Sequence, residues 1–225
     1  MACSRRRLLG QITGLLLGGA ARAAAAPPLV RVEEIDPTIA TDLSYYKPDN
    51  VFGRRFYPSN VALLRRPVAE RLARANAWLR RAGYRLLIWD AYRPRSIHRR
   101  MWEVAPDRRF LAHPRRGSNH SRGAAVDVTL IRLDGSPVPM PTPHDEFTRR
   151  ARRGATRGVS PEARRNWARL DAAMRQAGFR PLAHEWWHFD APEARRYPLS
   201  DLPLPPESPP KRRDSATLSI LTETT

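Results

Sequence analysis

Two short segments, far apart in the chain, hold the side chains best suited to chemistry. The first reads Ser-Asn-His-Ser-Arg-Gly-Ala-Ala-Val-Asp and contains His120 and Asp127, and the second reads Glu185-Trp-Trp-His188. A catalytic zinc site needs three protein ligands, an open coordination position for water, and a nearby base that accepts a proton from this water. His120, Asp127 and His188 are the predicted ligands. Glu185 is the predicted base.

The residues around these four side chains favour such a site. Gly123 lets the chain turn tightly before a predicted strand, which would hold Asp127 at a fixed place. Burial of the two tryptophans would put Glu185 and His188 at the edge of a water-poor pocket, where the pKa of a carboxyl group rises toward the range of a general base. The alternatives are a turn-capping Asp127, a surface His120, and a surface Glu185 beside two core tryptophans.

A third candidate segment, Asp90-Ala-Tyr-Arg93-Pro, follows a predicted buried strand. The guanidinium of Arg93 is permanently charged and offers a planar fork of donors. Opposite a metal ion, it could stabilise the oxyanion that forms when water attacks a carbonyl group. The alternative is a structural ion pair between Asp90 and Arg93 that closes the turn.

Asp145 is a fourth candidate, because a fixed carboxylate could bind the free ammonium group of a small peptide. The alternative is that Asp145 or Glu146 caps a helix. The other histidines have no spacing that requires metal, and we interpret them as packing or surface groups: His98, His113, His144 and His184. Among them His184 is the one most expected to contact a metal ligand.

The elements that must position these residues follow from apolar periodicity and from Pro and Gly boundaries. A short strand and turn are expected within 29–40. The predicted helices are 67–82, 95–103 and 161–177, and the predicted strands are 84–90, 125–131, 179–183 and 186–189. Helices and short strands do not alternate regularly, so we predict a single α+β domain in which helices flank a small antiparallel sheet.

The ends of the chain differ from this domain in composition. Residues 1–26 combine arginines, a short apolar run and an alanine tract, which predicts a signal peptide of the twin-arginine type, with an ordinary secretory signal as the alternative. Residues 27–198 would be the catalytic domain, and 199–225 a disordered Pro/Ser/Thr-rich tail. We therefore expect a periplasmic or secreted protein whose mature form has no membrane span.

Cysteine usage and charge narrow the function further. The only cysteine, Cys3, lies in the predicted signal, so a metal would be held by nitrogen and oxygen. Removing the four arginines of that signal lowers the formal charge from +18 to +14. This charge could indicate a nucleic-acid binder, but no nucleic-acid-binding motif accompanies it, so we expect no nucleic-acid partner. A positive surface also favours anionic glycans or lipids.

The candidate segments together resemble the D-alanyl-D-alanine dipeptidases of the vancomycin-resistance type, within the zinc D,D-peptidase family. The resemblance covers about residues 43–188 and rests on Asp-Ala-Tyr-Arg-Pro, on Gly-Ser-Asn-His through Asp-Val-Thr-Leu, and on Glu-Trp-Trp-His-Phe. It implies a hedgehog-like fold and one zinc ion per subunit, with the ligands, base and transition-state arginine assigned above. It also places Ser118, Asp145 and Tyr45 at the subsite for the amino end of the substrate. Two positions depart from the family pattern, which usually has glycine at Pro141 and phenylalanine at His144.

The activity that the resemblance implies is hydrolysis of D-alanyl-D-alanine, or a similar small D,D-dipeptide, to free D-alanine in peptidoglycan metabolism. One alternative is a D,D-carboxypeptidase or endopeptidase that acts on peptidoglycan stem peptides. Another is a zinc-bearing binding domain without catalysis, although Glu185, which such a domain would not need, is present.

Overall fold

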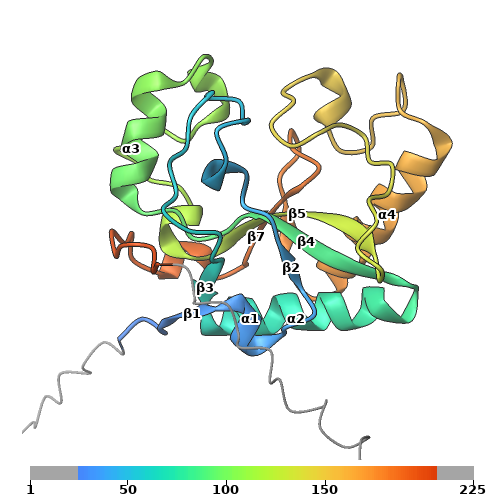
Figure 1. Ribbon diagram of the computed structural model, residues 1–225, viewed down its shortest axis with the longest axis horizontal. Helices are drawn as coiled ribbons and strands as arrows, with labels where there is room; N and C mark the ends of the chain where they lie inside the picture. The colour runs from blue at the N-terminus through green and yellow to red at the C-terminus, as the bar shows by residue number, and fades with distance from the viewer. Residues whose placement is uncertain (1–24, 207–225) are drawn as a thin grey trace, which may run out of the picture.

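A five-stranded sheet forms the centre of the computed structural model, which describes residues 25–206 (Figure 1). Its strand order is β2-β4-β5-β7-β6; β2 and β4 are parallel, and all other neighbours are antiparallel. The strands are β2 (Ala40–Thr41), β4 (Tyr84–Asp90), β5 (Ala125–Arg132), β7 (His188–Asp190) and β6 (Arg180–Pro181). A separate antiparallel pair joins β1 (Leu29–Arg31) and β3 (Leu63–Arg65).

Four α-helices surround the sheet, so the predicted α+β class is confirmed. Figure 1 shows α2 running along one side of the sheet, with α3 and α4 toward opposite ends of the molecule. The helices are α1 (Val32–Ile35), α2 (Arg66–Arg81), α3 (Arg95–Val104) and α4 (Pro161–Gln176). Short 3-10 helices lie in the connections: η1 (Ser44–Tyr46), η2 (Arg108–Phe110), η3 (His120–Arg122), η4 (Arg149–Ala151) and η5 (Ala194–Arg196).

The two long helices begin and end as their sequences indicate. Pro67 lies in the first turn of α2, where a missing N–H costs nothing, and the chain leaves the helix through Gly83 at a φ of 84°. At the start of α4, the Ser160 hydroxyl accepts a hydrogen bond from the Ala163 N–H at 3.1 Å. The apolar periodicity of α2 marks the face that is buried, with Val68, Leu72 and Leu79. On α4 Asn166 is buried and Trp167 only partly so.

Strand β5 is the most enclosed strand of the sheet. Its residues 125–131 are all buried, because it lies between β4 and β7 and is covered on both faces. Successive side chains of β5 therefore point alternately into two buried regions, and neither set faces solvent. Val126 and Val128 belong to the hydrophobic core, while Asp127 lies on the opposite face.

Two predictions about the C-terminal half are wrong. Trp186 and Trp187 form a turn before β7 rather than part of a strand, although both are fully buried. Residues 199–206, which we predicted to be disordered, pack against the domain: the Tyr92 hydroxyl donates to the carbonyl of Leu202 at 3.0 Å, and Leu204 is buried. The rest of the predicted tail, 207–225, and nearly all of the predicted signal peptide lie outside the described residues.

Within residues 25–206, no helix combines the length and the apolar character that crossing a bilayer requires.

A buried asparagine ties α2 to the edge of the sheet. The amide of Asn76 donates to Asp36 at 2.8 Å and to Thr38 at 2.9 Å, and its carbonyl accepts from the Leu86 N–H at 2.9 Å. Because Asn76 is fully buried, water cannot replace these partners. The side chain thus fixes α2 relative to β4 and to the loop before β2.

Asn76→Ala should lower the free energy of unfolding by about 3 kcal/mol, because a backbone N–H and a carboxylate lose their partner. Urea denaturation measures the change. The exposed Arg74→Ala on the same helix is the matched control and should change stability by less than about 0.5 kcal/mol. Equal stability of the two variants would contradict this role of Asn76.

Candidate active site

Three adjacent strands place three polar side chains in one row across the sheet. Asp90 of β4 pairs with Asp127 of β5, which pairs with His188 of β7. Directly paired residues share a face, so all three side chains lie on the face opposite the Val126 core. The register shifts between Ile88 and Asp90. Ile88 pairs with Val128, so in a regular ladder Asp90 would pair with Val126 and not with Asp127. The bulge therefore brings Asp90 into the row.

A fourth polar side chain, His120, lies beside this row and comes from η3, just before β5. Gly123 ends this short helix at a φ of 67°, a backbone conformation that favours glycine. A Cβ atom there would lie 2.3 Å from a methyl carbon of Leu29. Gly123 therefore allows the tight turn after His120, as the sequence suggested, and the Leu29 side chain packs closely against it.

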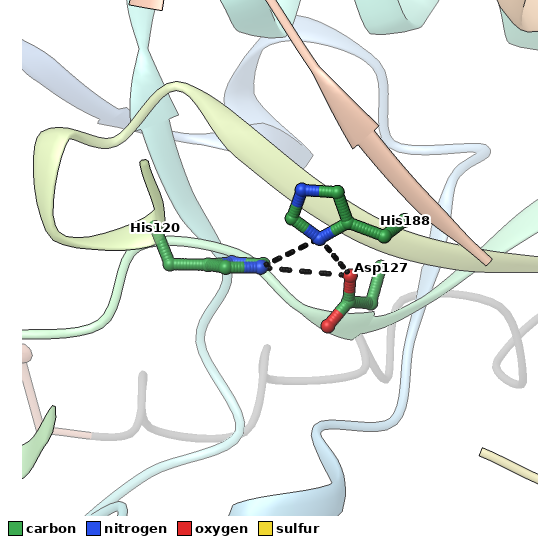
Figure 2. Close-up of side chains that lie close together, drawn as sticks. All are labelled: His120, Asp127 and His188. Carbon is green, nitrogen blue, oxygen red and sulfur yellow. Dashed lines mark hydrogen bonds and ion pairs between the residues drawn. The ribbon is translucent and has the colours of Figure 1, made fainter. Parts of the chain in front are cut away.

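The ligand atoms of the predicted metal site converge (Figure 2). His120 Nε2 lies 3.2 Å from His188 Nδ1 and 3.5 Å from Asp127 Oδ1, and His188 Nδ1 lies 2.9 Å from Asp127 Oδ1. Atoms that bind one zinc ion tetrahedrally at about 2.0–2.1 Å are about 3.3 Å apart. The spacing therefore suits a single metal ion without rearrangement of the backbone.

The outer nitrogens of both rings already have acceptors. His120 Nδ1 donates to the carbonyl of Ala91 at 2.8 Å, and His188 Nε2 donates to Asp190 Oδ1 at 3.0 Å. With these tautomers the inner nitrogens carry lone pairs, and they face a carboxylate oxygen. Three buried acceptors with no donor between them need a cation, so the donor set fits a divalent metal.

Glu185 lies next to this cluster without belonging to it. Its Oε2 is 4.0 Å from His188 Nδ1. The neighbouring Trp186 and Trp187 are fully buried, and burial raises the pKa of Glu185 to about 7. A carboxyl group in this range can accept and return a proton near neutral pH. The structure thus places Glu185 where a general base would act.

The ion pair of Arg93 with Asp90, which was the alternative interpretation, is present. The Arg93 guanidinium forms a buried ion pair with Asp90, to which Nε donates at 3.1 Å. The same group lies over the Tyr45 ring, 5.1 Å from its centroid, and lines the cavity that contains the metal cluster. The Asp90 pair therefore holds the guanidinium at the cavity wall, which is compatible with a role toward substrate.

The other predicted substrate residues line the same cavity of about 1050 Å³. The Tyr45 hydroxyl donates to Asp145 Oδ2 at 2.8 Å, so these two lie at one end of the site. Ser118 accepts a hydrogen bond from the His120 N–H at 3.2 Å. Asp145 has a φ of 57° and caps no helix, because the following 3-10 helix is capped by Thr148.

The expectation for His184 is wrong, because this residue is exposed rather than in contact with a ligand. His144 packs against Trp89, as a packing group should, and it also lies 3.4 Å from Asp127 Oδ2, a contact that we did not expect. Asp190, which we did not consider, accepts from His188. A sequence signal for it existed, because residues two apart on a strand share a face.

Comparisons with known proteins find a family match and several related proteins. The model of a family described as D-ala-D-ala dipeptidase matches residues 25–203. A D-alanyl-D-alanine dipeptidase of Escherichia coli (strain K12) is 36% identical over 171 residues, which are 76% of this chain and 88% of the relative. A D-alanyl-D-alanine dipeptidase of Enterococcus faecium is 32% identical over 195 residues, covering 77% and 92%. One of Streptomyces coelicolor is 32% identical over 183 residues, covering 72% and 90%.

Metal addition should stabilise the folded protein if the three acceptors share an ion. Zn²⁺ at about 1,000 times its dissociation constant should add about 4 kcal/mol to the free energy of unfolding of metal-stripped protein. Differential scanning calorimetry measures the shift. Asp127→Asn should abolish most of it, and the exposed Asp49→Asn should keep it. A full shift in Asp127→Asn would show that the ion binds elsewhere.

Proposed function

The chain belongs to the family of D-ala-D-ala dipeptidases, and from that premise we propose that it uses zinc to hydrolyse D-alanyl-D-alanine, or a similar small D,D-dipeptide, to free D-alanine. The observation that carries this proposal is the convergence of His120, Asp127 and His188 beside an uncoordinated Glu185. Two imidazoles, one carboxylate and a neighbouring carboxyl base are the parts of a catalytic zinc site.

Zinc bound by these three ligands would supply Lewis acidity, which polarises a carbonyl oxygen and makes water acidic near neutral pH. The protein supplies the remaining steps. Glu185 accepts a proton from the water that attacks the amide carbon and returns it to the nitrogen as the C–N bond breaks. Arg93 offers N–H donors to the oxygen that becomes negative during the attack.

Asp145 and Tyr45 support recognition of a free amino end. The cavity end that they form carries a buried carboxylate, which a substrate ammonium group would neutralise. Burial raises the pKa of Asp145, so a positive partner there would also favour its ionised form. A substrate with a blocked amino end would leave this carboxylate unpaired.

The size of the cavity favours a second candidate, a D,D-carboxypeptidase or endopeptidase acting on longer peptides. About 1050 Å³ is at the upper end of the range for sites that hold drug-sized ligands, and its wall includes Trp102, Phe110 and Phe147. The Asp145 carboxylate and the size of the cavity therefore favour different substrate lengths. A single assay with free and blocked substrates separates them.

The purified protein should contain one zinc per chain and should release D-alanine from D-Ala-D-Ala far faster than from its N-acetyl derivative. Elemental analysis and a D-amino-acid oxidase assay measure the two quantities. Preference for the blocked substrate would favour the carboxypeptidase, and no hydrolysis of either would refute both.

Glu185→Gln is the matched variant, because it keeps the shape of the side chain and removes the base. It should lower kcat by 10² to 10⁴-fold, typical of general-base removal, with the zinc content unchanged. Unaltered hydrolysis would refute the assignment of Glu185.

We also propose that the protein acts outside the cytoplasm, in peptidoglycan metabolism. The support is the composition of residues 1–26, with paired arginines directly before two leucines. Changing Arg6 and Arg7 together to Lys should retain the protein in the cytoplasm, as cell fractionation would measure. Arg22→Lys, farther along the same segment, should leave export intact, and equal export of both variants would contradict a twin-arginine route.

A further inference from the structure

His144 is an imidazole buried between two carboxylates. Its Nε2 lies 3.4 Å from Asp127 Oδ2 and 3.5 Å from Asp145 Oδ1, and 7% of its side chain is exposed. Asp127 is a ligand of the candidate metal site, and Asp145 belongs to the amino-end subsite. A single ring nitrogen therefore lies beside both a candidate metal ligand and a candidate substrate-binding residue.

Packing fixes the orientation of this ring. The Trp89 indole stacks on it with centroids 5.0 Å apart and planes at 26°, and the Trp187 ring meets it edge-on at 5.5 Å. On the far side, Ser44 Oγ lies 2.8 Å from Nδ1. A ring held on both faces and at one nitrogen can present only Nε2 to the carboxylates.

The hydrogen bonds determine what that nitrogen does. The carboxylates accept and do not donate when ionised, so Nε2 must carry the hydrogen. The Ser44 hydroxyl can donate to Nδ1, which suits this tautomer. Asp127 then has a donor on Oδ2, while its Oδ1 faces the inner nitrogens of His120 and His188.

We propose that His144 is a positioning residue for Asp127. Its Nε2–H donates to Oδ2 and so orients the carboxylate with Oδ1 directed at the metal. The same hydrogen faces Asp145, so the two carboxylates compete for it, and the charge on Asp145 weakens the hold on Asp127. This inference rests on the proposed metal site and adds a residue to it. A phenylalanine here would keep the ring on Trp89 but would remove the donor.

His144→Phe should raise the dissociation constant of Zn²⁺ by 10 to 100-fold, the range for loss of a partner that orients a metal ligand. Chelator competition on the full-length protein measures the constant without reference to activity. His144→Gln, whose amide can reach the position of Nε2, should recover most of the affinity. Melting temperatures of the metal-free variants report whether each folds, and if His144→Phe does not, weak Zn²⁺ binding by folded His144→Gln would overturn the proposal.

A double-variant cycle tests the competition between the carboxylates. Asp145→Asn removes a negative charge near the ion in either background, which by itself weakens Zn²⁺ binding. The test is therefore the difference: Asp145→Asn should favour Zn²⁺ binding more when His144 is present than in the His144→Phe background. The exposed His113→Phe is the control and should leave the dissociation constant unchanged.

The outcomes separate this inference from the proposed function. Failure of the unaltered protein to bind Zn²⁺ would refute both. If the unaltered protein binds Zn²⁺ and the dissociation constant of His144→Phe is within twofold of its value, only the role of His144 is refuted. An Asp145→Asn effect of equal size in both backgrounds would refute the sharing of the hydrogen, and a Gln variant as weak as the Phe variant would refute the role of the donor.

Discussion

The convergence of three buried acceptors is the constraint on which the rest of the structure depends. His120 Nε2, His188 Nδ1 and Asp127 Oδ1 lie 2.9–3.5 Å apart, and neutral rings that donate from their outer nitrogens turn lone pairs toward one another here. Such a cluster is unfavourable unless a cation occupies its centre. Fixed partners outside the cluster, the carbonyl of Ala91 and the carboxylate of Asp190, prevent the two rings from turning their N–H groups inward.

The sheet makes this arrangement rigid and separates it from the hydrophobic core. Because β5 is buried on both faces, its alternation places Val126 among core residues and Asp127 among polar ones without exposing either to bulk water. Arg93, neutralised in part by Asp90, and Asp145 both contact Tyr45 in this cavity: the guanidinium lies over the ring, and the hydroxyl donates to the carboxylate. A dipeptide with a free ammonium group and a carbonyl that becomes negative would find a partner of opposite charge for each group.

Much of this could be predicted from the sequence where the cause is local. The bounds of β4 and the start and end of α2 follow from apolar runs and from Pro and Gly. The turn at Trp186 could not be distinguished from a strand, because burial of a short apolar run does not reveal its backbone conformation. The place of His144 depends on a long loop folding back over β5, and the pairing of Asp90 with Asp127 depends on a bulge; neither leaves a periodic signal.

The two departures from the family pattern have different consequences for that loop. Its course past position 141 is fixed by contacts that follow Pro141: the Trp186 indole donates to Thr142 Oγ1 at 2.9 Å, and Tyr45 donates to Asp145. Proline fixes φ and lacks an N–H, and the subsite forms with proline at this position. At position 144 the imidazole stacks on Trp89 and offers a donor at its edge, which the phenylalanine that the resemblance implies would lack. A substitution that preserves packing while adding a polar atom beside a metal ligand acts on the chemistry of the site and not on the fold.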